Sequence, residues 1–283
     1  MMNAIRIPQI REIHQKPFRG LVVADSSVDE FLRSGAEPGD LVVRKGCIIK
    51  SGSMKTRTRL IDLPTSDLGC SGVSVLVKEY FFRNGLHGLK PFLLKPRPTK
   101  VWQISWHLLG RGISVPEPFC YLLKRKGLLC TAGYLFSRYI PQCHNLAELL
   151  IDPEKRERRL NSGKLIGTLA RSIASLHESR VLHGDLKWSN ILVHEVEDRV
   201  WFVDLDAARQ HRRALTPARA SRDLADFVFN GLEYGVEESV FNRLIDGYTR
   251  FRRFTRREMD KPVEKAVGRL GKRCRQNRAV RIS

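Results

Sequence analysis

Three oxygen-bearing side chains in a short stretch of the sequence have the types and spacing needed for phosphoryl transfer. Asp185 and Asn190 lie five positions apart in HGDLKWSN (183–190), and Asp204 follows fourteen positions later in VDLD (203–206). A carboxylate can orient an attacking hydroxyl and accept its proton, which we expect of Asp185. An amide oxygen and a second carboxylate are ligands that magnesium prefers, so Asn190 and Asp204 are candidate metal ligands.

The order of these residues is the one that kinases use. In kinases, a loop of the form H-x-D-L-x-x-x-N precedes an apolar strand that ends in a metal-binding aspartate. Lys187, two positions after Asp185, is then placed to bring positive charge to the transferred phosphate. A lone H-x-D triplet would carry little weight, but the complete ordered set is specific. The alternative is a polar loop and a strand-end carboxylate without catalytic roles.

Short apolar segments flank the candidate residues and should position them. Residues 181–182, 191–193 and 200–205 are rich in β-branched, aliphatic and aromatic side chains, which indicates strands. An amphipathic helix is predicted over residues 160–177, directly before the loop, because its apolar residues recur with helical spacing. These residues are Leu165, Leu169, Ile173 and Leu176.

An earlier region has the short apolar segments of a β-sheet. We predict strands at 41–43, 47–49, 58–61 and 73–80. Lys78 ends the apolar part of the last strand, where a kinase places the lysine that reaches the nucleotide phosphates. The alternative is an ordinary lysine at a strand edge. No G-x-G-x-x-G segment precedes it, and Gly52 is the best candidate for a glycine that covers the phosphates, although a plain hairpin turn explains it equally well.

A helix predicted over residues 100–109 lacks an acidic residue that kinases have. The corresponding kinase helix carries a glutamate that pairs with the strand lysine. Here no Asp or Glu lies between Glu79 and Glu117, and Gln103 is the nearest polar substitute. This is the largest departure from the kinase pattern.

The segment after Asp204 is short and basic. Four arginines lie within residues 207–221, no A-P-E triplet follows, and Asp223 comes nineteen positions after Asp204. Protein kinases use a longer segment here to bind peptide, so the short one favours a small or lipid-linked acceptor. We expect Asp223 to begin a helix and to accept backbone N–H groups of the catalytic loop; the alternative is a simple helix-start carboxylate.

On these residues the sequence resembles the bacterial lipopolysaccharide core kinases of the heptose and Kdo type. The resemblance covers about residues 41–250 and rests on 183–190 and 203–206, with VKEY (77–80) and GISVP (112–116) in support. It implies a bilobal, protein-kinase-like α+β fold and the transfer of phosphate from ATP, with Mg²⁺, to a heptose or Kdo hydroxyl of the lipopolysaccharide core.

The resemblance also implies a role for each candidate residue. Asp185 is then the catalytic base, Lys187 and Lys78 contact phosphates, and Asn190 and Asp204 hold the metal.

Four parts are expected along the chain: an N-terminal extension (1–40), a β-rich N-lobe (41–139), a mainly helical C-lobe (140–255) and a basic tail (256–283).

The charge of the chain predicts acidic partners. Its 283 residues carry a formal net charge of +20, and residues 250–283 hold thirteen Lys or Arg against three Asp or Glu. Lipopolysaccharide and the inner leaflet are anionic, and a basic cluster gains about 1 kcal/mol per cation near such a surface. We therefore expect peripheral attachment to the inner face of the cytoplasmic membrane. A solvated tail or an affinity for nucleic acid is the alternative.

Other features of the sequence favour a cytoplasmic protein. The six cysteines form no C-x-x-C pair, which indicates reduced thiols. The first fifteen residues lack the apolar core of a signal peptide, and no segment reaches the roughly 18 apolar residues of a membrane span.

Two other functions compete with the core kinase. The first is an atypical protein kinase or ATPase, of the RIO type or linked to tRNA modification, because such proteins are also basic and carry an HGD loop. The second is a nucleotide-binding pseudokinase scaffold, because the glutamate partner of Lys78 is missing. The presence of Lys78, Asp185, Asn190 and Asp204 argues against the scaffold.

Overall fold

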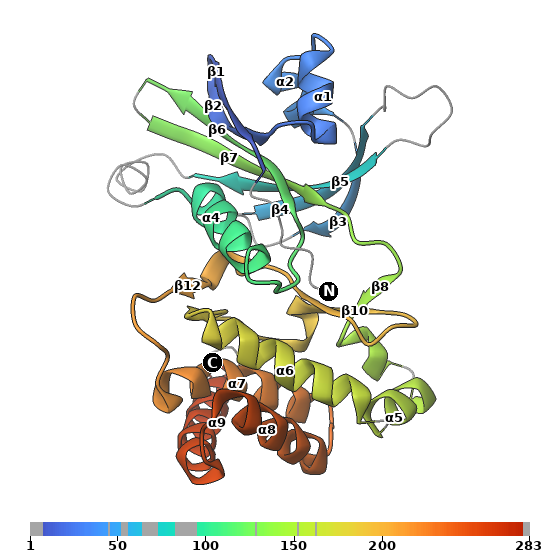
Figure 1. Cartoon of the computed structure of the whole chain (residues 1–283), viewed down its shortest axis with the longest axis vertical. Coiled ribbons are helices and arrows are strands. Elements are labelled where there is room, and N and C mark those ends of the chain that lie inside the picture. The colour runs from blue at the N-terminus through green and yellow to red at the C-terminus, as the bar shows by residue number, and fades with distance from the viewer. Residues whose placement is uncertain are drawn as a thin grey trace. The chain divides into compact units, whose positions relative to one another are not determined.

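The computed structural model divides into two compact units. It describes residues 8–44, 46–51, 56–63, 73–82, 95–127, 129–151, 153–161 and 163–279. The first unit comprises residues 1–112 and 116–141, and the second comprises 113–115 and 142–283. A β-sheet dominates the first unit and helices dominate the second (Figure 1). This confirms the predicted α+β class, with a β-rich N-terminal part and a helical C-terminal part.

The first unit is built on a seven-stranded antiparallel sheet. Its strand order is β1-β2-β6-β7-β5-β4-β3. The strands are β1 (Ile10–Gln15), β2 (Phe18–Val23), β3 (Cys47–Ser51), β4 (Thr56–Leu63), β5 (Val73–Phe81), β6 (Pro118–Lys126) and β7 (Leu129–Arg138). Strands β3, β4 and β5 were expected, because their apolar residues alternate or run together between basic turns.

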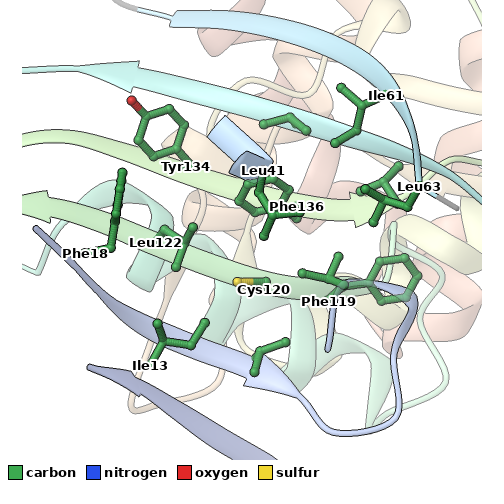
Figure 2. Close-up of a cluster of buried hydrophobic side chains, with 14 of the residues drawn as sticks. Ile13, Phe18, Leu41, Ile61, Leu63, Phe119, Cys120, Leu122, Tyr134 and Phe136 are labelled. Atoms are coloured by element: carbon green, nitrogen blue, oxygen red, sulfur yellow. The ribbon is translucent and has the colours of Figure 1, made fainter. Parts of the chain in front are cut away.

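Two short helices contribute to the core on one face of this sheet. Side chains alternate between the faces of a strand, so Val75 and Val77 of β5 face the same side. They join a buried cluster with Phe136 of β7 and with Leu41, which comes from a helix (Figure 2). The helices are α1 (Ser27–Arg33) and α2 (Pro38–Val43).

The opposite face of the sheet carries α4 (Arg97–Leu109). Trp102 of this helix packs edge-on against Tyr121 of β6, with ring centroids 5.5 Å apart. Gly133 of β7 lets the helix approach, because a Cβ there would lie 2.7 Å from Cγ of Pro98. Lys78 pairs with Leu135, two positions from Gly133, so Lys78 lies on the α4 face.

The predicted strand at residues 41–43 is wrong, because this segment is the end of α2. Pro38 occupies the first turn, where its missing N–H has no helical partner to lose. Glu37 and Asp40 form a reciprocal capping box, in which the Glu37 N–H donates to Asp40 Oδ2 at 2.7 Å. These local signals outweigh the β-branched valines that suggested a strand.

The segment before Leu41, which we expected to form an N-terminal extension outside the β-rich lobe, contributes two strands to the sheet. β1 pairs with β2, and β2 pairs with β6. β1 was missed because it is an edge strand with one buried residue, Ile13, so its apolar alternation is weak. Ser26 caps the N-terminus of α1, because its Oγ accepts a hydrogen bond from the Asp29 N–H at 3.2 Å.

The second unit is mainly helical. Its helices are α5 (Pro153–Asn161), α6 (Lys164–Glu178), α7 (Pro217–Glu233), α8 (Glu238–Arg252) and α9 (Arg256–Ala279). α6 contacts α8, and α7 contacts α9. The single helix predicted over 160–177 is instead divided into α5 and α6, because Gly163 adopts a left-handed conformation with φ 73°. In the described part of the chain, no helix has the length and apolar character needed to cross a membrane.

Short strands and turns of the second unit hold the candidate site. β8 (Cys143–Asn145), β10 (Ile191–His194) and β11 (Val200–Phe202) form one small sheet, and β9 (Val181–Leu182) pairs with β12 (Arg209–Gln210). The predicted strand to residue 205 ends earlier, at Phe202, because Asp204 is left-handed with φ 61°. A single 3₁₀ turn, η1 (Glu148–Leu150), follows β8.

Candidate active site

The catalytic loop leaves β9 through a glycine that tolerates no side chain. Gly184 has φ 77°, a region that favours glycine. A Cβ at this position would lie 2.7 Å from the carbonyl oxygen of Ala207. The arginine that protein kinases carry at this position is therefore excluded by the approach of the 205–207 turn.

Replacing Gly184 with alanine is expected to destabilise the second unit. The left-handed backbone costs about 1–2 kcal/mol for a residue with a Cβ, and the contact with Ala207 adds about 1–2 kcal/mol. Gly235→Ala is the matched control, because Gly235 has φ 72° but open space around its Cβ position. Urea unfolding should show a loss about twice as large for Gly184→Ala. Equal losses would contradict the steric argument.

The structure brings Asp185, Lys187 and Asn190 together. Lys187 Nζ lies 2.7 Å from Asp185 Oδ1. Asn190 Nδ2 donates to Asp185 Oδ2 at 3.1 Å and to the Asp185 carbonyl at 2.9 Å. Each oxygen of the Asp185 carboxylate thus contacts a donor from the same loop. The Asp185 side chain nevertheless remains 39% exposed and open to a substrate.

The charge of Lys187 is secured by its carboxylate partner. The hydrogen bond to Asp185 raises the pKa of Lys187, and this outweighs partial burial, which lowers it. Lys187 therefore carries its charge through the whole range in which a kinase works. A fixed cation beside Asp185 is suited to stabilise a negative phosphoryl group.

Asn190 and Asp204 meet through a backbone contact. The Val203 N–H donates to the Asn190 carbonyl at 3.0 Å, which places Asp204 directly beside this residue. Since the Asn190 amide nitrogen is engaged by Asp185, its Oδ1 faces away from that carboxylate. An amide oxygen and a carboxylate form a donor set that fits Mg²⁺. In the residues that the structure describes, no three His, Cys, Asp or Glu side chains gather as an alternative metal site.

His183 fixes the position of the strand that precedes Asp204. Its Nε2 donates to the Val203 carbonyl at 3.0 Å, with Nε2 as the protonated nitrogen. Burial lowers the pKa of His183, and the nearby carboxylates, Asp223 foremost, raise it less. The ring is therefore neutral at physiological pH. Its hydrogen bond links the catalytic loop to the segment that carries Asp204.

Asp223 braces the start of the loop, as the sequence predicted, but it does not begin a helix, because α7 already starts at Pro217. Its carboxylate accepts the N–H groups of His183 at 2.6 Å and Gly184 at 2.8 Å. His177 Nε2 lies 3.1 Å from Asp223 Oδ2, and His177 Nδ1 lies 2.8 Å from the Tyr248 hydroxyl. Burial raises the pKa of Asp223. The hydrogen bond with His177 and the charges around the carboxylate lower this pKa by a larger amount, so the carboxyl is ionised.

Helix α7 continues this brace beyond Asp223. Asn230 Oδ1 accepts the Trp188 N–H at 3.0 Å, and the Phe227 carbonyl accepts Trp188 Nε1 at 3.0 Å. The Trp188 and Phe227 rings stack with centroids 5.1 Å apart. Residues 223, 227 and 230 share one helix face, which therefore lies along the loop from its start to its end. Sequence reasoning missed Phe227 and Asn230, although their helical spacing from Asp223 could have indicated them.

Asp226 is a further carboxylate near the loop that the sequence did not reveal. Partial burial and the charges of Asp223 and Asp185 raise the pKa of Asp226 to about 6, although Lys187 opposes this. The folded protein therefore holds the Asp226 proton more tightly than the unfolded chain does. Its ionisation between pH 4 and 7 destabilises the fold, as is common for carboxylates kept near functional sites.

Asp226→Asn is expected to stabilise the protein at pH 8 but not at pH 4. At pH 4, close to the ordinary Asp pKa of 3.8, the folded wild-type side chain is protonated and the unfolded one is only partly ionised, so the substitution changes stability much less. Above the raised pKa the ionised carboxylate carries its full cost, which we set at roughly 1 kcal/mol after allowing for solvent screening of a partly exposed group. Urea unfolding at both pH values checks this. An equal difference at pH 4 and pH 8 would contradict the titration.

The remaining candidates belong to the first unit. Lys78 Nζ lies 5.5 Å from the Tyr80 ring centroid. Gln103, the suggested substitute for the missing glutamate, accepts a hydrogen bond from Lys95 Nζ at 3.0 Å. Glu79 pairs with Arg59 at 2.5 Å on the opposite face of β5 from Lys78. Gly52, the candidate phosphate-covering glycine, lies outside the described residues.

Comparison with known proteins agrees with this geometry. Residues 89–248 match the lipopolysaccharide kinase (Kdo/WaaP) family. A search of the curated proteins found no match. The solved structure entitled "WaaP in complex with acyl carrier protein" is similar with a TM-score of 0.61 and 20% identity, covering 90% of this chain and 99% of that chain. The predicted protein-kinase-like fold is thereby confirmed.

The family match covers more than half of the chain and includes Asp185, Lys187, Asn190 and Asp204. The resemblance expected from the sequence is confirmed. The protein belongs to the lipopolysaccharide kinase (Kdo/WaaP) family, and it is a phosphotransferase that acts on sugar hydroxyls.

Proposed function

We propose that this kinase transfers the γ-phosphoryl group of ATP, with Mg²⁺, to a heptose or Kdo hydroxyl of the lipopolysaccharide core. The observation that carries the proposal is the Asp185 carboxylate, held by Lys187 and Asn190 yet partly open to solvent. A carboxylate fixed in this way can receive an acceptor hydroxyl without first reorganising.

Each residue of the loop has a role in this proposal. Asp185 orients the sugar hydroxyl and accepts its proton as the new O–P bond forms. Lys187, whose charge is secure, offsets the negative charge of the phosphoryl group during transfer. Asn190 Oδ1 and the Asp204 carboxylate hold Mg²⁺, which when bound neutralises the ATP phosphates. Lys78 of the first unit is proposed to contact the nucleotide phosphates, with Gly52 covering them.

The connection between the metal residue and the brace supports a small acceptor. After Asp204 the chain makes one 3₁₀ turn, η3 (Leu205–Ala207), and the two-residue strand β12, and it enters α7 at Pro217. This leaves no long segment of the kind with which protein kinases bind peptide. A sugar hydroxyl on a large glycolipid therefore suits the site better than a peptide side chain does.

The distribution of charge supports a location at the cytoplasmic face of the inner membrane. Nine of the thirteen cations of residues 250–283 lie in the basic α9, which begins with Arg256 and Arg257. Such a cluster suits reversible binding to anionic lipid. We propose that the protein is peripheral to this membrane and meets its acceptor there.

Transfer to purified acceptor tests the proposal. The full chain is incubated with ATP, Mg²⁺ and core oligosaccharide, and phosphate incorporation is measured by mass spectrometry. We expect the wild type to add one phosphate to a heptose or Kdo, and chelation of the metal to abolish transfer. Phosphorylation of protein instead would favour a RIO-like kinase, and nucleotide binding without turnover would favour a scaffold.

A further inference from the structure

The segment between the metal residue and the brace concentrates positive charge. Within residues 207–222 the chain carries five arginines and one histidine but no Asp or Glu. We call residues 209–222 the arginine segment. Its arginines are all exposed: Arg209, Arg212, Arg213, Arg219 and Arg222. This is a denser cluster than a solvated surface needs, and like charges that gather in this way destabilise the fold.

Both ends of the arginine segment are attached to the catalytic loop. At its start, β12 pairs with β9 so that Arg209 lies opposite Leu182, the residue before His183. At its end, Arg222 precedes Asp223, which accepts the N–H groups of His183 and Gly184. The exposed arginines are thus fixed to the same few residues that position Asp185.

The cations also lie close together in space. The His211 N–H donates to the Arg180 carbonyl at 2.7 Å, and Arg180 Nη1 donates to the Arg212 carbonyl at 3.0 Å. Burial lowers the pKa of His211, and the charges of Arg219 and Arg209 lower it further. His211 is therefore neutral in a cationic surrounding.

No acidic side chain within the described residues forms an ion pair with any arginine of this segment. The described ion pairs of the second unit involve other cations, such as Arg159, Arg252 and Arg256. A cluster of arginines without an ion-pair partner among the described residues is suited to an anion from outside the chain. Guanidinium groups match phosphate and carboxylate geometry, because they donate two parallel hydrogen bonds.

We propose that the arginine segment binds the phosphate or carboxylate groups of the same saccharide acceptor whose hydroxyl is presented to Asp185. The inference rests on the proposed function and adds a determinant of acceptor specificity to it. A membrane surface is a weaker fit, because a contact needed only for attachment does not require anchoring to the catalytic loop, and α9 offers cations for that purpose.

A consequence follows for the order of reactions. An acceptor recognised by its anionic groups must already carry them when it reaches this enzyme. A reaction that adds an acidic sugar or a phosphate to the core must therefore precede this one. A neutral saccharide with the same target hydroxyl is then a poor substrate.

The test uses a double variant, Arg209→Gln with Arg219→Gln, in the full chain. Steady-state kinetics are measured with lipid-free core oligosaccharide in three forms: native, chemically dephosphorylated and carboxyl-reduced. For the native acceptor we expect KM to rise about tenfold with kcat within about twofold, because charge-assisted hydrogen bonds are lost away from the reacting atoms. The KM for ATP should not change. The treatment that removes the recognised group should raise the wild-type KM and abolish the difference between wild type and variant.

The control variant is Arg158→Gln with Arg171→Gln. Both side chains are exposed, on α5 and α6, so the pair removes the same charge without touching the arginine segment or the basic helix α9. Unfolding midpoints confirm that both double variants are folded. The control should leave the KM for every acceptor form near the wild-type value.

Several results would overturn the inference. These are an equal loss in the control, a loss confined to acceptor embedded in anionic vesicles, a rise in the KM for ATP, or a variant effect that survives both chemical treatments. Active wild type with an unaffected Arg209/Arg219 variant would remove this inference and leave the proposed function standing. Wild type that transfers no phosphate to any form of the acceptor would instead remove the proposed function.

Discussion

Replacing Asp185 with asparagine is expected to lower kcat for phosphoryl transfer about a thousandfold. Asparagine keeps the size of the side chain but cannot accept the proton of the sugar hydroxyl, and general base catalysis is worth about 10²–10⁴ in rate. It also removes the charge that holds Lys187 at 2.7 Å. Single-turnover transfer to core oligosaccharide at saturating ATP measures the chemical step directly.

The matched control for this prediction is Asp198→Asn. Asp198 is a partly exposed carboxylate in the same unit, where it pairs with Arg159 at 3.1 Å. Loss of this pair should lower stability by less than about 1 kcal/mol, and kcat should stay near that of the wild type. If Asp185→Asn retained activity within tenfold of the control, Asp185 would not be the base.

Asp223→Asn is expected to lower both the stability of the protein and its kcat. The amide can accept through one oxygen only, so one of the N–H groups of His183 and Gly184 loses its acceptor in the buried loop. Disruption of a buried carboxylate and its partners costs about 3 kcal/mol. We expect kcat to fall about a hundredfold as well, because a misplaced loop no longer presents Asp185 in a reactive geometry.

The pH dependence separates this role from simple loss of packing. The pKa of Asp223 is lowered in the folded state, so its ionised form contributes stability that is fully present above the ordinary pKa of 3.8. That contribution is lost as pH falls through the lowered pKa. The stability difference between wild type and Asp223→Asn should therefore be largest at neutral pH and shrink in acid. A difference that does not change with pH would contradict the electrostatic brace.

Tyr248→Phe provides the graded control for the same network. It removes the hydroxyl that contacts His177 Nδ1 and leaves the Asp223 carboxylate and its two N–H donors in place. The expected loss of stability is about 1 kcal/mol, which is typical of one buried hydrogen bond. Transfer activity should remain within a few-fold of the wild type.

The residues of the catalytic loop could be predicted from the sequence, because they lie close together in the chain. Asp185, Lys187 and Asn190 lie within six residues, and their contacts form within one loop. The position of Asp204 beside Asn190 was also accessible, because two short apolar strands joined by a polar turn place their ends together.

The supports from α7 were missed, because only their helical spacing from Asp223 indicates them in the sequence. Asn230 and Phe227 reach the loop from about forty positions away, through contacts that depend on how α7 packs. The raised pKa of Asp226 depends on the same placement, since its causes are burial and the charges of residues far away in sequence.

Errors in the first unit have local causes. The 41–43 segment has strand-like residues, but Pro38 and the Glu37–Asp40 capping box make it helical. β1 exposes most of its residues and so lacks a clear apolar alternation. In both cases residue preference was a weaker signal than capping or pairing with a neighbouring strand.

The most direct test of core phosphorylation compares strains that differ only in this gene. Lipopolysaccharide is extracted from a deletion strain and from the same strain carrying the wild type or Asp185→Asn, and core phosphate is measured by mass spectrometry. We predict that the deletion lacks one core phosphate, that the wild type restores it, and that Asp185→Asn does not. An identical phosphate content in all three strains would contradict the assignment of this protein as the kinase of a core sugar.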